Sequence, residues 1–169
     1  MEHLWRDRMA YISGATRPPE GLCVFCEAPK HADDTVFILQ RGQFAYVIMN
    51  IFPYNNGHVM VNPYAHVDSI EKLDDATLTE IMQLTNLSLA AIRSAAQPHA
   101  FNLGANIGQA AGGGIKDHFH FHIVPRWQGD TNFMPIVAET RVLPEKLEDS
   151  YQRLKLAFDQ IKLQMTNDK

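Results

Sequence analysis

The sequence predicts a single α+β domain built around an antiparallel sheet. Short apolar or alternating runs bounded by glycine, proline and asparagine indicate strands, and longer segments of helical periodicity stand apart from them. A chain of 169 residues, 46% of them hydrophobic, is long enough for one buried core. The chain contains no repeat and no low-complexity tract. Strands segregated from two or three helices are typical of the α+β class.

The strands are expected to follow one another as an antiparallel meander. Arg41-Gly42 and residues 53–57 carry turn chemistry between the first three runs, and the fifth run is rich in aromatic and β-branched residues and ends before Pro125. The expected strands are residues 36–39, 45–49, 58–61, 101–106 and 118–124.

Three helices are expected, one of them long and core-facing. Asp74 or Asp75 would cap the long helix, which runs to about Ala96 and ends before Pro98. Its apolar residues recur at helical spacing: Leu78, Ile81, Met82, Leu84, Leu87, Leu89 and Ile92. A last helix is expected at about 144–164, with Pro144 in its first turn, and a short one at about 4–12. The predicted organisation is an N-terminal extension over 1–21, a domain over 22–135 and a C-terminal helical extension over 136–169 packed on that domain.

Charge and hydropathy exclude some classes of partner. The formal net charge is -4 and the pI is near 6.0, which argues against sequence-independent nucleic-acid binding because that needs a basic surface. No apolar run reaches the length of a membrane span, and the charged first residues lack a signal-peptide core. We therefore expect a cytoplasmic protein that binds neither nucleic acid nor membrane.

Three histidines alternate with apolar residues at 118–124, directly after a glycine run at 112–114. In a strand, the period of two would place His118, His120 and His122 on one face and the apolar residues on the other. A shared metal is an alternative, since imidazole is a common ligand. A strand rises about 3.3 Å per residue, so His118 and His122 start roughly 13 Å apart and one ion could bind two neighbours but hardly all three.

Residues 118–124 match the His-φ-His-φ-His-φ-φ signature of the histidine triad (HIT) superfamily of nucleotidyl hydrolases and transferases. Residues 50–58 with 61–67 resemble the family's earlier block, and residues 106–113 resemble its phosphate loop; the resemblance covers roughly 22–132. It implies a five-stranded antiparallel sheet, a homodimer and a nucleotide substrate, without an organic cofactor. Several segments are similar to the bacterial diadenosine-tetraphosphate (Ap4A) phosphorylase-like branch: Trp5, 8–12, 106–114, 125–127, 129–130 and 132–133.

The resemblance assigns catalytic roles to four histidines. Neutral imidazole can attack phosphorus, and the family's nucleophile is the middle triad residue, here His120. His118 and His122 would bracket the phosphate, with protonated His122 stabilising charge on its oxygens. His58 matches the family's fourth histidine, near the triad, although it could simply pack at the start of a strand.

Nucleotide and phosphate binding is expected from a second group of residues. Glycines let backbone N–H groups approach an anion closely, so Gly112, Gly113 and Gly114 would line a phosphate loop, which lacks the P-loop pattern. Family members commonly carry Gln, Ser or Thr where this chain has Gly114, so the leaving-group contact departs from the pattern, and Gln109 could substitute. By resemblance, Asn50 would hold the ribose and Asn106 would lie next to the reacting phosphate. Trp127 either stacks on a second nucleotide or is a core or interface residue.

The two cysteines, Cys23 and Cys26, form a Cys-x-x-Cys pair. In a reducing compartment such a pair indicates redox chemistry, metal binding or chance. Bacterial family members that this chain resembles bind zinc through such a pair, a later histidine and the first triad histidine. These ligands correspond to Cys23, Cys26, His66 and His118, which would make a closed, structural Cys2His2 zinc site.

The combined prediction is an enzyme that cleaves dinucleoside polyphosphates of the Ap4A type at the α-phosphate, through a covalent nucleotidyl intermediate on His120. Phosphate or water would be the acceptor. Three alternatives stay open: an adenosine phosphoramidase, a hydrolase in which a metal on His118 and His120 activates water, and a non-catalytic nucleotide-binding module.

Overall fold

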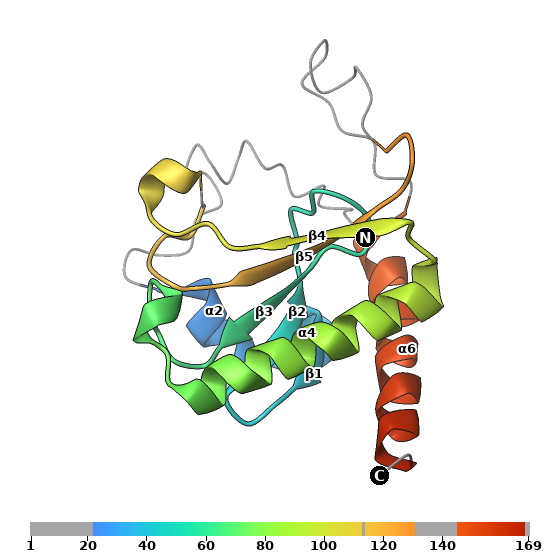
Figure 1. The fold of residues 1–169 in the computed structure, drawn as a ribbon, viewed down its shortest axis with the longest axis horizontal. Coiled ribbons are helices and arrows are strands. Elements are labelled where there is room, and N and C mark those ends of the chain that lie inside the picture. The colour runs from blue at the N-terminus through green and yellow to red at the C-terminus, as the bar shows by residue number, and fades with distance from the viewer. Residues whose placement is uncertain (1–21, 113, 131–144, 168–169) are drawn as a thin grey trace.

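The computed structural model describes residues 22–112, 114–130 and 145–167. Within these residues the predicted α+β architecture is confirmed: five antiparallel strands form one sheet in the order β1-β2-β3-β5-β4 (Figure 1). The strands are β1 Ile38–Arg41, β2 Ala45–Met49, β3 Val59–Pro63, β4 Ala100–Gly104 and β5 Phe121–Arg126. The first three follow one another as the expected meander, and β5 lies between β3 and β4.

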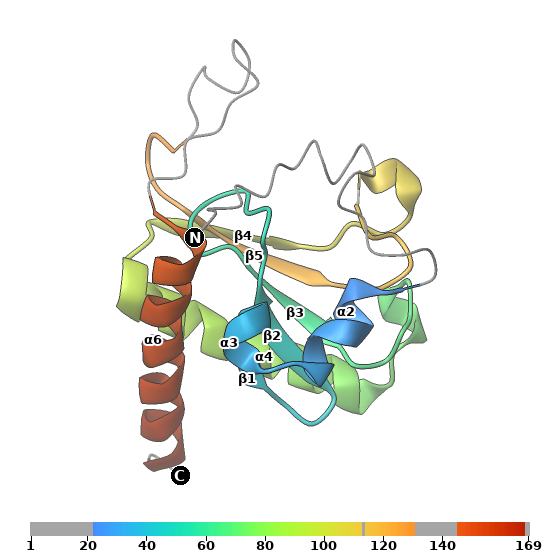
Figure 2. The same ribbon diagram turned by 180° about the vertical axis from the view of Figure 1, so that it is seen from behind.

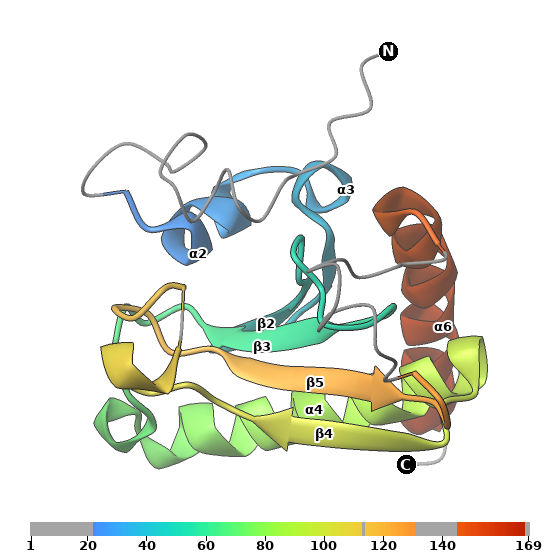
Figure 3. The same cartoon turned by 90° about the horizontal axis from the view of Figure 1, so that it is seen from above.

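The helices cover the sheet unequally. The long helix α4 (Asp75–Ala96) crosses one face, and α6 (Leu147–Asn167) packs against α4 and β1 (Figures 1 and 3). On the other face lie the short helices α2 (Val24–Glu27) and α3 (Asp33–Val36), as Figure 2 shows. Single 3-10 turns occur at Ala28–Lys30, Ile70–Lys72 and Gln109–Ala111. The expected helix at 4–12 falls outside the described residues.

Strand alternation divides the buried side chains between the two faces. In β2, Val47 and Met49 belong to the large core under α4 and α6, whereas Tyr46 and Ile48 belong to a smaller cluster with Phe25 of α2. This smaller cluster covers only the β1–β3 half of the second face. The β4–β5 half, which carries the triad segment, therefore stays more open.

The sequence prediction for the long helix is confirmed. Asp74 is its N-cap and accepts a hydrogen bond from the Thr77 N–H at 2.8 Å. The helix ends at Ala96, where Gln97 adopts a left-handed conformation just before Pro98. Met82 was among the apolar residues expected to face the core, but its side chain is 49% exposed, so the prediction was wrong for this residue.

Several element boundaries differ from the prediction. The first strand begins at Ile38, because Val36 completes α3 and Phe37 turns the chain in a left-handed conformation (φ 63°). The last helix begins at Leu147, after the non-helical Glu145 and Lys146; Pro144 lies outside the described residues.

The fifth strand covers less of the triad than predicted. It begins at Phe121 rather than at residue 118, because pairing with β3 ends at Val61↔Phe121 and pairing with β4 ends at Gly104↔His122. It also continues through Pro125, which pairs only with β4. Of the three triad histidines, only His122 is therefore part of the strand.

The β1–β2 turn is fixed by a carboxylate from α4. Glu80 accepts hydrogen bonds from the N–H groups of Gln43, Phe44 and Ala45 at 2.8, 2.5 and 2.8 Å. Gly42 makes room for it, since a Cβ there would lie 2.7 Å from the carboxylate. The turn and the helix are thus joined by one side chain.

Replacing Glu80 with alanine is expected to lower the free energy of unfolding by about 1.5–3 kcal/mol, because three backbone donors lose a charged acceptor. Urea unfolding measures this change. A matched control is Asp159→Ala, which removes a carboxylate paired with Lys155 on the exposed side of α6 and should cost less than about 0.5 kcal/mol. Equal effects of the two substitutions would contradict the role given to Glu80.

Among the described helices, none combines the length and apolar character that crossing a membrane requires.

Candidate active site and metal centre

Three histidines meet on the face opposite α4. His58 immediately precedes β3, His122 lies in β5 opposite Met60 of β3, and His120 precedes β5. The rings of His58 and His122 are 5.1 Å apart, and those of His120 and His122 are 4.8 Å apart. All three side chains are buried. The structure therefore brings together three of the four predicted catalytic histidines, while the ring of His118 points elsewhere.

The hydrogen bond of His120 fixes which ring nitrogen carries the proton. Its Nδ1 lies 2.8 Å from the carbonyl oxygen of His118, and a carbonyl can only accept. The neutral ring therefore has N–H at Nδ1 and a lone pair at Nε2. Burial lowers the pKa of His120, partly offset by this hydrogen bond, so the neutral form predominates at pH 7. Such an imidazole is suited to nucleophilic attack.

His58 and His122 form a relay with an equally definite proton arrangement. The Tyr54 N–H donates to His58 Nδ1 at 3.0 Å, which places the proton of neutral His58 on Nε2. That Nε2–H then donates to His122 Nδ1 at 2.9 Å, so neutral His122 carries its proton on Nε2. His122 Nε2 is buried and meets no hydrogen-bond partner among the described residues. A buried, unsatisfied donor beside a nucleophile is well placed to hydrogen-bond an oxygen of a bound ligand.

His122 was expected to act in its protonated form, but its surroundings favour the neutral ring. Burial, and then the neighbouring His120, lower the pKa of His122 to about 4. The ring is therefore neutral at pH 7, and its contribution is a fixed N–H donor rather than a positive charge.

In a titration followed by ¹⁵N NMR, His122 is expected to stay neutral well below pH 6.5 and to protonate near pH 4. Because its folded-state pKa is below the unfolded value, the unfolded chain takes up the proton first. Its contribution to stability is therefore present above pH 6.5 and is lost as the pH falls toward 4. Protonation of His122 at pH 6–7 in the folded protein would contradict this arrangement.

Phe25 is a neighbour of His120 that the sequence did not reveal. Its ring lies 5.0 Å from that of His120 and 5.5 Å from that of His118. Phe25 belongs to α2, between the two cysteines, so the Cys-x-x-Cys segment lies directly against His118 and His120. One apolar residue in a short helix has no periodicity that would have marked this contact.

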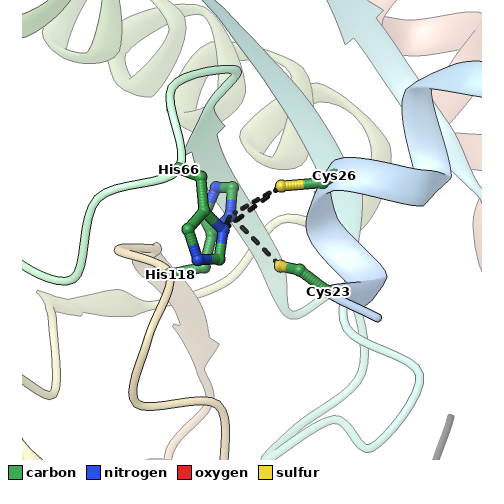
Figure 4. A group of neighbouring side chains, drawn as sticks. All are labelled: Cys23, Cys26, His66 and His118. Carbon is green, nitrogen blue, oxygen red and sulfur yellow. Dashed lines mark hydrogen bonds between the residues drawn. The ribbon is translucent and has the colours of Figure 1, made fainter. Parts of the chain in front are cut away.

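The ring of His118 points into a cluster with Cys23, Cys26 and His66 (Figure 4). His118 Nδ1 lies 3.3 Å from Cys23 Sγ, 3.5 Å from Cys26 Sγ and 3.3 Å from His66 Nδ1, and His66 Nδ1 lies 3.3 Å from Cys26 Sγ. The four ligand atoms all lie within 4.8 Å of one another. Zinc–sulfur bonds near 2.3 Å and zinc–nitrogen bonds near 2.0–2.1 Å give ligand–ligand distances of about 3.3–3.8 Å in a tetrahedron.

The protonation of His118 also suits metal binding. Its Nε2 lies 3.0 Å from the Pro63 carbonyl and must donate to it, which leaves a lone pair on Nδ1, the atom that faces the cysteines. Burial and the neighbouring Cys23 raise the pKa of the Cys26 thiol to about 11, and a cation between the sulfurs would favour the thiolates instead. The donor set therefore fits one metal ion held by four protein ligands.

The predicted nucleotide-binding residues occupy different places. Asn106 lines a cleft of about 360 Å³ together with Tyr54 and His122. Trp127 lines a second cavity of about 830 Å³ with Asp130 and the end of α4. Asn50 follows β2, where its Oδ1 accepts the Phe52 N–H at 2.9 Å. Gln109, Gly112 and Gly114 are exposed. Gly113 lies outside the described residues. So do Trp5, 8–12 and 132–133, which resemble segments of the Ap4A phosphorylase-like branch. The nucleotide-binding roles of all these residues stay predictions.

The fold and this histidine arrangement identify the class of protein. The family model described as "HIT domain" matches residues 30–129, which include all five of the histidines just described and exclude both cysteines. The chain therefore belongs to the HIT family.

Within that family, several relatives are similar to this chain over most of its length. An AP-4-A phosphorylase from Mycobacterium tuberculosis is 37% identical over 161 residues, which cover 91% of this chain and 83% of that protein. An adenosine 5'-monophosphoramidase from Schizosaccharomyces pombe is 30% identical over 62% of this chain and 74% of its own length. A zinc-bound histidine triad protein from Mycobacterium smegmatis superposes with a TM-score of 0.66 at 25% identity, covering 83% of this chain and 95% of that one.

Proposed function

We propose that this protein cleaves dinucleoside polyphosphates of the Ap4A type at the α-phosphate, through a covalent nucleotidyl intermediate on His120. The observation that carries the proposal is the hydrogen bond from His120 Nδ1–H to the His118 carbonyl, which leaves the Nε2 lone pair as the nucleophile. The similarity to the mycobacterial AP-4-A phosphorylase supports this choice of substrate.

The reaction has two steps. Nε2 of His120 attacks the α-phosphorus of Ap4A, an N–P bond forms, the bridging P–O bond breaks, and ATP leaves with the electron pair. An oxygen of phosphate or water then attacks the same phosphorus, and the N–P electron pair returns to His120. Phosphate gives ADP and water gives AMP. The Nε2–H of His122 would hydrogen-bond a phosphoryl oxygen as charge develops in both steps.

A metal shared by His118 and His120 is disfavoured by the positions of their ring atoms. His118 Nδ1 faces Cys23 and Cys26, and its Nε2 donates to Pro63. His120 uses its Nδ1 on a carbonyl. The two rings therefore lack a common point at which one ion could activate water.

We also propose that the cluster of Cys23, Cys26, His66 and His118 binds a structural zinc ion. Four protein ligands close the tetrahedral site, so the ion would hold α2 to the segment before β5 rather than bind substrate. The ligand spacing supports zinc, as does the similarity to a zinc-bound family structure.

A homodimer is a further part of the proposal. β4 is an edge strand, and Leu103 on it is 46% exposed, so a second copy could continue the sheet there. Sedimentation equilibrium should then give twice the chain mass of 19.1 kDa. A mass of one chain at micromolar concentration would contradict the dimer.

The test is an assay of Ap4A cleavage with and without inorganic phosphate, with the products separated by ion exchange. ADP with ATP, formed only when phosphate is present, would establish a phosphorylase. AMP with ATP in both reactions would establish a hydrolase. Adenosine phosphoramidate is assayed in parallel because a phosphoramidase relative is 30% identical. Turnover of the phosphoramidate alone would overturn Ap4A as the substrate.

A further inference from the structure

The cleft beside His122 continues along the open half of the sheet. Its floor is made by His122, Val124 and Arg126 of β5, with Gly104 and Asn102 of β4 opposite the first two. Gly104, opposite His122, has no side chain, and a Cβ there would meet no atom of the described residues within 4 Å. A ligand at His122 therefore has open space toward Arg126.

Arg126 is held in a fixed orientation at the other end of this cleft. Its Nε and one terminal nitrogen donate to the two carboxylate oxygens of Asp130 at 2.7 Å each, and its other terminal nitrogen donates to Asn102 Oδ1 at 2.8 Å. Asn102 pairs with Val124 across the two strands. Along β5, Val124 lies between His122 and Arg126. The guanidinium is thus held between Asn102 and Asp130, and the Arg126 side chain is still 38% exposed.

Asp130 is itself engaged by other donors. Besides Arg126, its carboxylate accepts the Trp127 N–H at 3.0 Å and Asn55 Nδ2 at 2.7 Å. Its side chain is only 12% exposed, so it lies behind the guanidinium rather than in the opening of the cleft. A ligand would therefore meet the arginine first.

The remaining lining of the cleft carries no formal charge among the described residues. It includes the phenol of Tyr54, the amides of Asn102 and Asn106 and the apolar side chain of Val124, and His122 is neutral at pH 7. A polyphosphate carries several negative charges and binds well where cationic groups receive them. Arginine suits this task because its planar guanidinium has five N–H donors, more than the three bonds to Asp130 and Asn102 use.

We propose that Arg126 is a specificity-determining residue that binds the phosphates of the leaving nucleotide beyond the α-phosphate, an inference that rests on the proposed function. With the α-phosphate at His120 and His122, the polyphosphate would extend along β5 through the space above Gly104. The Cα atoms of residues 122 and 126 are about 13 Å apart at strand rise, and both side chains line the same cleft. Arg126 would thereby distinguish substrates with a long phosphate chain from those with a small leaving group.

The test measures the binding of Ap4A and of AMP to the full-length His120→Ala protein, which does not consume the ligand, by isothermal titration. AMP carries the α-phosphate and lacks the phosphates beyond it. Adding Arg126→Gln is expected to weaken Ap4A binding roughly 10- to 100-fold, the range for a hydrogen bond to a charged group, and to change AMP binding less than about twofold. Arg126→Lys keeps the charge but loses the fork, so its loss for Ap4A should be smaller.

The matched control is Arg93→Gln, which removes the same charge. The Arg93 guanidinium lies 5.0 Å from the centroid of the Phe101 ring, on the α4 side of β4, away from the cleft. It should leave both affinities unchanged. Equal weakening of AMP and Ap4A by both Arg126 variants would show that Arg126 only supports the Trp127–Asp130 turn, and would overturn the proposal.

The outcomes also separate this proposal from the proposed function. Tight Ap4A binding that survives Arg126→Gln overturns the role of Arg126 alone. If the His120→Ala protein binds Ap4A no more tightly than AMP, Ap4A is not the substrate and both proposals fail.

Discussion

Replacing His120 with alanine is expected to reduce Ap4A cleavage by about 10⁴-fold or more, because the covalent route loses its nucleophile. His122 and the backbone of the loop would still bind phosphate, so the affinity for Ap4A should change far less than kcat. A single-turnover measurement, quenched in acid and analysed by mass spectrometry, should detect an adenylyl group on the wild-type protein and none on the variant.

A matched control for this experiment is His31→Ala. His31 is an exposed histidine that follows the 3-10 turn Ala28–Lys30. The His31→Ala variant should cleave Ap4A as fast as the wild-type protein. Substantial Ap4A turnover by His120→Ala would contradict the covalent mechanism. It would favour direct attack by water and would leave the relay of His58 and His122 as the main catalytic groups.

Removing the metal ligands is expected to impair both stability and activity. The double variant Cys23→Ser/Cys26→Ser should contain no zinc by atomic emission, whereas the wild-type protein should contain one ion per chain. A bound metal stabilises the folded state by about 4 kcal/mol when its free concentration is a thousand times Kd, and for a chain of this size that corresponds to roughly 8–16 °C in Tm.

The loss of activity has a specific structural cause. The ring of His118 belongs to the metal cluster, and its carbonyl orients His120. Phe25, between the two cysteines, contacts the His120 ring. Without the ligands, α2 and residue 118 lose their anchor, so the ¹⁵N signals of His120 should show a mixture of both neutral tautomers. Unchanged Tm and unchanged His120 signals in the zinc-free variant would contradict this coupling.

The features that the sequence predicted well are those with a local chemical signature. Helix α4 has a capping aspartate, a helical period and a following proline; its cap was predicted as Asp74 or Asp75 and its end as about Ala96, and the structure has Asp74 and Ala96. The ligands Cys23, Cys26, His66 and His118 were named from a spacing and a resemblance, and the fold brings their atoms together.

The features that the sequence did not predict depend on partners distant in the chain. The alternation at 118–124 suggested one continuous strand, but β5 begins only where β3 and β4 supply partners. The orientation of His58 depends on the backbone N–H of Tyr54, a group that every residue except proline possesses. The contact of Arg126 with Asn102 crosses two strands whose register no local pattern specifies.

Residue 118 contributes to two neighbouring sites through different atoms, so substitutions at this position should affect the two sites differently. Only the ring would bind the proposed metal, while the atom that orients His120 is a main-chain carbonyl that any residue at 118 would supply. The position should therefore accept another zinc-binding side chain, such as cysteine, with little harm to the nucleophile. Residue 120, whose own ring would perform the reaction, has no such freedom. Two histidines only two positions apart are thus open to very different substitutions.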